Sequence, residues 1–376
     1  MSGNNILKYS LKLFLTLFLL LFSFAVVFSQ EKDTEKNDWP FFKYNVNRDS
    51  FSKSEILPPY KLKYKIAVND QIRTSPVVKN GIIYIGSNDK YFYAIEIESG
   101  KIKWKNKTEG IILGAAAINN DIVYVGNETG FFYAFKTEDG SILWKFFVEV
   151  PISSSPIISK GAVLLSCFDG TLYCLDANTG GLKWKYNAKG SCWSSPAIDS
   201  DKVFIGTTNG DMLAISLDNG KLEWEFHSEG AIISTPAINN NLVFFGAANY
   251  YFYAVDVNTG KTKWTFKTDG EINSSPSVDN DTVYIGSDDN SLYAFSKDKG
   301  AIKWKITTEG NITCSPAVTG KHIYFGSWDK TLYVVEINSG VIIWKYETEG
   351  AILSSPIVTD KIIFASTDKN IYILEK

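Results

Sequence analysis

The chain has 376 residues, of which 45% are hydrophobic and 21% are charged. This composition is typical of a globular protein and excludes a disordered, collagen-like or coiled-coil chain. The 38 basic and 41 acidic residues give a net charge of −3, so nucleic acid, which requires a basic surface, is not an expected partner. The two histidines, His227 and His322, leave few groups for general-base or metal chemistry near neutral pH.

Residues 1–29 have the features of a signal peptide. Lys8 and Lys12 precede an uncharged run from Leu13 to Phe28, which is 16 residues long. A membrane-spanning helix needs roughly 20. We place cleavage after Ser29, with a retained anchor as the alternative. No cysteine lies near this position, so a lipid anchor is not expected. The sequence therefore predicts a protein exported to the periplasm or the extracellular space.

Residues 30–56 form a lead-in segment before the main domain. Within it, Asp38 to Phe42 reads Asp-Trp-Pro-Phe-Phe. Such a stretch is too apolar to remain in solvent. We therefore expect it to dock on the edge or over one face of the domain that follows.

A repeat of 40 residues fills residues 57–376. A tryptophan, a glycine four positions before it, a proline and a second glycine all recur in phase, which indicates a repeat architecture. The prolines run from Pro76 to Pro356 with Ala116 in the one gap. The second glycine series runs from Gly86 to Gly326, is interrupted by Ser166 and ends at Ser366. The tryptophans are Trp104, Trp144, Trp184, Trp224, Trp264, Trp304 and Trp344, and Tyr64 holds the same phase one repeat earlier.

Each repeat predicts four short β-strands joined by tight turns. In the unit after Gly270 these strands are 272–278, 282–285, 291–295 and 301–306, with Asn, Asp and Gly between them. One such unit cannot bury both faces of its sheet, whereas a ring of units buries each against the next. The first-strand and fourth-strand signatures each occur eight times. The sequence therefore predicts an all-β, eight-bladed β-propeller of four-stranded antiparallel blades.

The ends of the repeat region predict how the ring closes. The region opens with a fourth strand, Lys61 to Val68, and ends with the first three strands of a blade, the last at Ile371 to Glu375. We expect the N-terminal strand to pair with the C-terminal three strands and complete the last blade. This pairing would remove two open strand edges.

One repeat carries a motif of known type. Ala254 to Trp264 reads Ala-Val-Asp-Val-Asn-Thr-Gly-Lys-Thr-Lys-Trp. It resembles the motif Ala-x-Asp-x-x-Thr-Gly-x-x-x-Trp of the pyrroloquinoline-quinone-like, or quinoprotein-type, β-propeller repeat. The resemblance covers residues 57–376, although the threonine is kept only at Thr179 and Thr259. It implies that the seven repeat tryptophans, Trp104 through Trp344, act as inter-blade contacts, each stacked near a glycine of a neighbouring blade.

Members of this family that use the quinone are dehydrogenases with long insertions, adjacent cysteines, calcium ligands and an aspartate base. This chain departs from that pattern, because its connections are bare turns and its four cysteines are not neighbours. Cys167, Cys174, Cys192 and Cys314 are interpreted as small buried hydrophobic residues, with a Cys167–Cys174 disulfide as the alternative. We expect no catalytic residue, cofactor or metal. Pyrroloquinoline quinone with calcium belongs only to the alternative of a quinone-dependent dehydrogenase.

Residues that break the repeat are the candidates for binding. The position two before each Ser-Pro pair varies, and we expect it to face the central funnel. It includes Arg73, Trp193, Asn273 and Thr313. An Arg and a Trp on one rim suit an anionic or aromatic group, or a peptide of a partner. Alternatively, Arg73 pairs with a nearby acid and Trp193 closes the channel.

The turn between the second and third strands supplies the remaining candidates, Phe168, Tyr250, Trp328 and Asp329. We expect this turn and the connection from the fourth to the first strand to share one acidic face. Turn formation alone explains the aspartates. Trp328 is different, because an exposed aromatic at a loop tip suits contact with a partner.

These features predict an exported, non-enzymatic scaffold, expected to be monomeric, that binds a protein partner in the cell envelope. The chain is similar to the BamB-type propeller family of outer-membrane β-barrel assembly, although that type is lipid-anchored and this chain lacks the required cysteine. The alternatives are the dehydrogenase and a carbohydrate-binding propeller, the latter because aromatic residues surround the funnel. Peripheral membrane association is left open.

Overall fold

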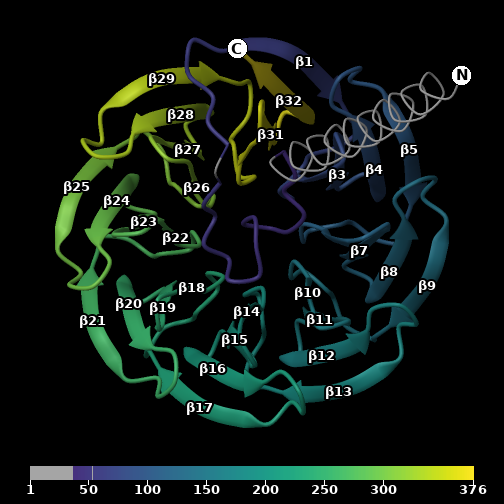
Figure 1. Ribbon diagram of the computed structural model, residues 1–376, viewed down its shortest axis with the longest axis horizontal. Coiled ribbons are helices and arrows are strands. Elements are labelled where there is room, and N and C mark those ends of the chain that lie inside the picture. Colours follow the sequence, from purple (N-terminus) through teal and green to yellow (C-terminus); the bar gives the residue numbers. More distant parts are fainter. Residues whose placement is uncertain (1–36, 53) are drawn as a thin grey trace, which may run out of the picture.

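The computed structural model describes residues 37–52 and 54–376. The signal peptide predicted for residues 1–29 and the beginning of the lead-in lie outside the described residues. The described chain forms eight four-stranded antiparallel sheets around a central axis (Figure 1). This arrangement confirms the all-β, eight-bladed propeller. Within the described ranges, no helix has the length and apolar character to cross a membrane.

Each blade runs from an innermost strand at the axis to an outermost strand at the circumference (Figure 1). The innermost strands are β2 (Val77–Lys79), β6 (Ala117–Asn119), β10 (Ile157–Ser159), β14 (Ala197–Asp199), β18 (Ala237–Asn239), β22 (Ser277–Val278), β26 (Ala317–Val318) and β30 (Ile357–Val358). The second strands are β3 (Ile82–Gly86), β7 (Ile122–Gly126), β11 (Ala162–Ser166), β15 (Lys202–Gly206), β19 (Leu242–Gly246), β23 (Thr282–Gly286), β27 (His322–Gly326) and β31 (Ile362–Ser366).

The third strands are β4 (Tyr91–Glu96), β8 (Phe131–Lys136), β12 (Thr171–Asp176), β16 (Asp211–Ser216), β20 (Tyr251–Asp256), β24 (Ser291–Ser296), β28 (Thr331–Glu336) and β32 (Asn370–Glu375). The outermost strands are β5 (Ile102–Lys107), β9 (Ile142–Phe147), β13 (Leu182–Asn187), β17 (Leu222–His227), β21 (Thr262–Lys267), β25 (Ile302–Thr307), β29 (Ile342–Glu347) and β1 (Lys61–Ala67). The second and third strands are buried on both faces because each blade lies between two others, whereas the outermost strands alternate between half-buried and exposed residues.

The innermost strands are much shorter than predicted. The predicted strand 272–278 is reduced to β22, Ser277–Val278. The residues before it leave the sheet because Pro276 has no N–H to donate to a ladder, and because the Ser275 hydroxyl accepts the backbone N–H of Thr235 in the neighbouring blade, at 3.0 Å. The polypeptide at the axis is therefore held between blades rather than within one.

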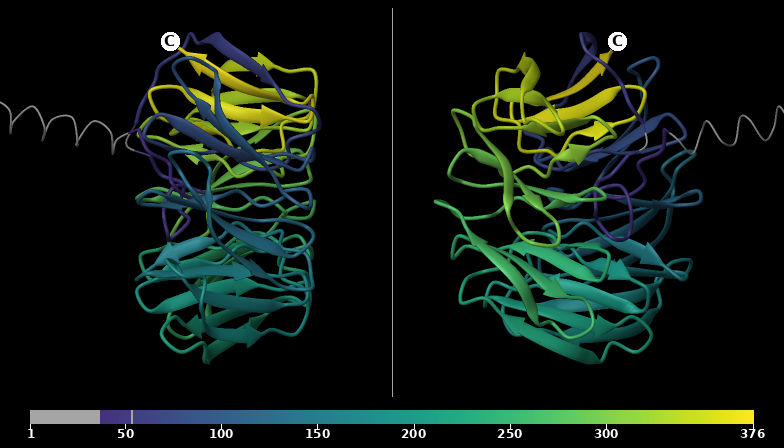
Figure 2. Two further views of the ribbon diagram at one scale, coloured as in Figure 1. Left: turned by 90° about the vertical axis from the view of Figure 1, so that its right-hand side faces the viewer. Right: turned by 60° about the vertical axis from the view of Figure 1, so that its left-hand side comes forward.

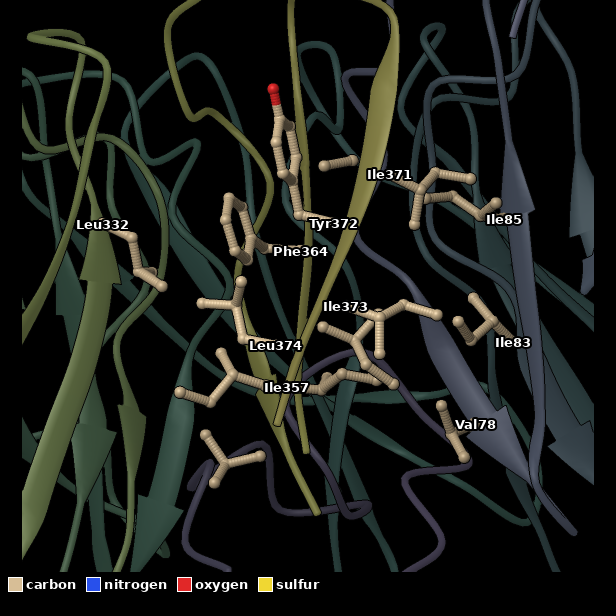
Figure 3. Close-up of a cluster of buried hydrophobic side chains, with 14 of the residues drawn as sticks. Val78, Ile83, Ile85, Leu332, Ile357, Phe364, Ile371, Tyr372, Ile373 and Leu374 are labelled. Carbon is tan, nitrogen blue, oxygen red and sulfur yellow. The ribbon is translucent and has the colours of Figure 1, made fainter. Parts of the chain in front are cut away.

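The ring closes as predicted, with β1 completing the last blade. β1 pairs antiparallel with β32 from Lys61 opposite Glu375 to Ala67 opposite Asn370. Figure 3 shows the core of this junction, where Ile371 and Ile373 of β32 lie close to Ile83 and Ile85 of β3. The first and last strands of the repeat region are thus held together by one sheet and one hydrophobic cluster.

The last blade is one residue shorter than the others, which corrects the predicted glycine series. Val358 of β30 pairs with Ile362, whereas Val278 of β22 pairs with Val283. The turn between these strands has therefore lost one residue. In consequence Ala365, and not Ser366, holds the glycine position.

Six repeat tryptophans lie against a glycine of the following blade. A Cβ atom added to Gly140, Gly180, Gly220, Gly260, Gly300 or Gly340 would lie only 2.5–2.8 Å from the indole atoms, so a larger residue does not fit there. The indole N–H of each donates to a backbone carbonyl of that blade at 2.8–3.0 Å. Trp344 differs, because the ring closes there, and it packs edge-on against Tyr60 with ring centroids 4.8 Å apart.

The four cysteines are buried and free, so the Cys167–Cys174 disulfide is not formed. Cys192 compensates for an exception in the glycine series. In the six blades that have the glycine, it makes room for an isoleucine, as Gly86 does for Ile112, whose Cγ2 would lie 2.2 Å from an added Cβ. At the equivalent place Ser166 has a Cβ, and the smaller Cys192 replaces the isoleucine.

Replacing Cys192 with isoleucine will therefore overpack this contact and lower the free energy of unfolding by about 1–3 kcal/mol. Adding Ser166→Gly will recover most of that loss, with a coupling energy of at least about 1 kcal/mol in a double-mutant cycle measured by urea unfolding. Additive effects of the two changes would contradict the compensation.

Candidate functional site

The lead-in closes one end of the central channel. We call residues 38–52 the plug. Figure 1 shows this segment at the centre of the ring, and Figure 2 shows it toward one flat face. Trp39 exchanges two backbone hydrogen bonds with Val78, of 2.8 and 2.9 Å. Plug carbonyls also accept the N–H groups of five further innermost strands, those of Ile118, Ile198, Ile238, Val278 and Val318.

Two cationic side chains of the plug are buried on the axis. Arg48 is 0% exposed. Its guanidinium donates to the carbonyls of Ser155, Pro156 and Pro196 at 3.0–3.2 Å, and to that of Phe42 within the plug. Lys43 donates to the carbonyl of Pro276. Burial lowers the pKa of Arg48 to about 9, so it remains charged at neutral pH. Arg48 thus joins the plug to two blades.

The other end of the channel is an open funnel. Its face carries the turns between second and third strands and the connections between blades, which bond to each other, as in Thr108 N–H to Lys90 O at 2.8 Å. Phe42 of the plug lines the inner end of the funnel. The empty volume of the funnel is about 570 Å³, part of which is open to solvent. Seven of the eight variable positions line it: Arg73, Leu113, Trp193, Ile233, Asn273, Thr313 and Leu353.

A ring of hydroxyl groups forms the funnel wall, and the sequence reasoning did not anticipate it. The hydroxyls of Ser75, Ser155, Ser195, Thr235, Ser275 and Ser355 each accept a backbone N–H from the adjacent blade at 2.9–3.2 Å. The Ser or Thr before each repeat proline is the feature of the sequence that marks this ring. The repeat pattern does not reveal its role, because each hydrogen bond joins two different blades.

Two pairs of predicted residues come together at the rim. The rings of Phe168 and Trp193 meet edge to face with centroids 5.5 Å apart, and Trp193 is 48% exposed. The indole N–H of Trp328, which is 51% exposed, donates to the Thr313 hydroxyl at 2.9 Å. Tyr250 is exposed at its own turn.

The remaining predicted residues have structural or solvent-facing surroundings. Asp329 accepts hydrogen bonds from the N–H groups of Thr331 and Glu309 and from the Tyr333 hydroxyl, which supports a turn-forming role. Arg73 contacts Gln71, at 3.4 Å, rather than an acid. Asn273 donates to Asp288 at 2.8 Å, and burial raises the pKa of that carboxyl.

Among the described residues, those that line the funnel include no Asp, Glu or His. Across residues 37–52 and 54–376, no group of three or more His, Cys, Asp and Glu side chains is placed to hold a metal ion. His227 contacts Asp211 at 2.7 Å on an outermost strand, and His322 is buried beside Glu55.

A family model described as "Outer membrane protein assembly factor BamB" matches residues 105–306 and 304–374. The chain belongs to this family. Among curated proteins, none matches the chain significantly.

Solved structures share the fold. BamB from Moraxella catarrhalis is 19% identical with a TM-score of 0.74, and the match covers 85% of this chain and 100% of that one. Quinohemoprotein alcohol dehydrogenase from Comamonas testosteroni is 13% identical with a TM-score of 0.81, over 92% of this chain and 81% of that one. The computationally designed Ika8 protein is 17% identical with a TM-score of 0.74, over 82% and 98%. At these low sequence identities, the similarity to the solved structures shows a shared fold.

Proposed function

We propose that this BamB-family protein is an exported, non-enzymatic scaffold whose funnel face binds a protein partner during assembly of outer membrane proteins. Family membership supports the role in assembly. The match to the whole length of the Moraxella catarrhalis protein adds support for the same propeller architecture. The partner, the export and the absence of enzymatic activity are parts of this proposal.

The observation that carries the proposal is the exposed Trp328 on the funnel face. Its side chain is held in place by the hydrogen bond to Thr313, yet half of its surface remains in solvent. Tryptophan is enriched among the residues that dominate protein interfaces, and a pre-positioned ring loses little entropy on binding. The equivalent positions in other blades hold smaller residues such as Asn88 and Thr208.

Replacing Trp328 with alanine will reduce capture of the partner at least roughly tenfold without changing the unfolding midpoint. The measurement is affinity capture of the mature protein from its own envelope, followed by mass spectrometry. Barrel-assembly components are the expected partners. The matched control is Phe147→Ala, because Phe147 is 53% exposed but lies on the circumference in β9. Equal capture by wild type and Trp328→Ala would contradict the proposal.

The quinone-dependent dehydrogenase is the second candidate, because dehydrogenases of that class share the fold. The funnel residues do not fit pyrroloquinoline quinone with calcium. Calcium takes six to eight oxygen ligands, usually including carboxylates, and the lining has no Asp or Glu to supply them or to act as a base. Dye-linked oxidation of alcohols or sugars after addition of quinone and calcium would favour this candidate instead.

A further inference from the structure

We infer that the funnel is a binding site for a short neutral saccharide, a function beyond the proposed scaffold role. Of the empty space of about 570 Å³, much is open to solvent, and the cavity itself is about 180 Å³. This is smaller than the range of about 300–1,000 Å³ for sites that enclose a drug-sized ligand, so the funnel would hold one end of a short saccharide and leave the rest in solvent. Its surface combines three features that suit a polyol: a wall of hydroxyls, an amide oxygen without a partner, and an aromatic face.

The wall offers hydrogen bonds of both kinds. Each of the six hydroxyls in the ring accepts one backbone N–H, as Ser195 accepts that of Ser155 at 2.9 Å. A hydroxyl has one donor and two acceptor sites, so this bond leaves its proton and a lone pair for a ligand. Sugar hydroxyls match such a wall because they also donate and accept.

The lining also holds an oxygen atom that lacks a partner. Asn273 Oδ1 is buried without a hydrogen-bond partner among the described residues. The Asn273 amide is oriented by its Nδ2 donating to Asp288, which leaves Oδ1 as an acceptor. An unsatisfied buried polar atom costs roughly 1–3 kcal/mol. A ligand rich in O–H donors would remove this cost.

Trp193 supplies the aromatic face. It lines the funnel, is about half exposed and packs against Phe168 in a T-shaped contact. The C–H face of a sugar ring is apolar and can cover such an indole while its hydroxyls point to the wall. A small-molecule site usually binds its ligand through shape complementarity and apolar contact, while a few polar groups fix the orientation of the ligand.

An extended peptide fits the funnel less well. A peptide that binds as an added strand needs free backbone groups at a sheet edge. Six innermost strands already donate their N–H groups to the plug, and six further N–H groups at the wall are taken by the hydroxyl ring. The lining also has no carboxylate to pair with a basic side chain.

The test is calorimetric titration of the mature protein with cellobiose, maltose and chitobiose, each up to about 10 mM, together with a glycan array. We expect at least one of these ligands to bind. Trp193→Ala will weaken that binding at least roughly tenfold, and Asn273→Leu will weaken it as well. Phe147→Ala will bind as wild type does, and all three variants will keep the unfolding midpoint.

Absence of binding to every sugar and every array glycan would overturn the inference, as would unchanged binding by Trp193→Ala. Binding of an extended peptide with the same dependence on Trp193, in the absence of sugar binding, would also overturn it. The scaffold proposal is tested separately by Trp328→Ala and partner capture, so either can fail alone.

Discussion

Replacing Arg48 with alanine will lower the free energy of unfolding by about 3–5 kcal/mol, a large part of the 5–15 kcal/mol typical of a folded domain. The guanidinium donates to four carbonyls on the axis, those of Phe42, Ser155, Pro156 and Pro196. The truncated side chain would leave these buried acceptors without a donor, and each costs free energy. The plug would lose the side-chain hydrogen bonds that join it to two blades. Unfolding by guanidinium chloride, followed by circular dichroism, gives the value.

Arg73 provides the matched control, because it is the only other arginine in the chain. Its side chain is exposed at the funnel rim and contacts only Gln71 in the described structure. Arg73→Ala should therefore change the free energy of unfolding by no more than about 0.5 kcal/mol. The free energy of unfolding of Arg48→Lys should lie between those of Arg48→Ala and Arg73→Ala, since the lysine ammonium cannot reproduce the planar fork of N–H donors of the guanidinium. Equal stability of Arg48→Ala and Arg73→Ala would show that the Arg48 side chain does not help to hold the ring.

Deleting residues 57–68 will abolish the folded ring and not one blade alone. The deletion removes β1, exposes the edge of β32 and takes Tyr60 away from Trp344. Tyr60 and Val68 are also part of the hydrophobic cluster at the junction. Without β1 the last blade loses the strand that continues into the first blade, and every blade depends on its two neighbours for burial. We expect loss of soluble protein and of the cooperative thermal transition.

Point variants separate this effect from the shortening of the chain. Tyr60→Ala removes a buried ring and should cost about 3–5 kcal/mol. Lys65 lies in β1, close in sequence to Tyr60, but its side chain is exposed and its ion pair with Glu349 is at the surface. Lys65→Ala should therefore cost less than about 1 kcal/mol. A deletion variant that kept its unfolding midpoint and its solubility would refute the role of β1 as the closing strand.

Most of the fold could be predicted from the repeat. The recurring tryptophans and glycines occupy one contact that each blade makes with the next, as Trp264 does with Gly300, and such a contact demands the same residue types in every copy. The phase of the two ends predicted the pairing of β1 with β32. The short innermost strands were not predicted, because their residues bond to neighbouring blades and to the plug, which the pattern of one repeat does not reveal.

The candidate site could be predicted only in part. Residues that break the repeat, such as Trp193 and Trp328, were found because packing does not dictate them. Their partners were not found. Phe168 and Trp193 are 25 positions apart and belong to different blades, and the Trp328–Thr313 bond depends on the fold of its turn. The plug was expected on the ring, but not Arg48 at its centre, because a lone arginine has no repeat to mark it.

By itself, the sequence determined the number of blades, their order and the strand that closes the ring. Each blade makes the same contacts with the next, so the same residue types recur at the same positions of every repeat. Only the tertiary structure decided that the lead-in closes the channel at one end, that hydroxyls encircle the other, and which rim residues meet. The physical reason is that each of these features joins segments far apart in the chain. Arg48 with Pro196, Ser75 with Ser355 and Phe42 with the funnel are contacts that no local pattern encodes.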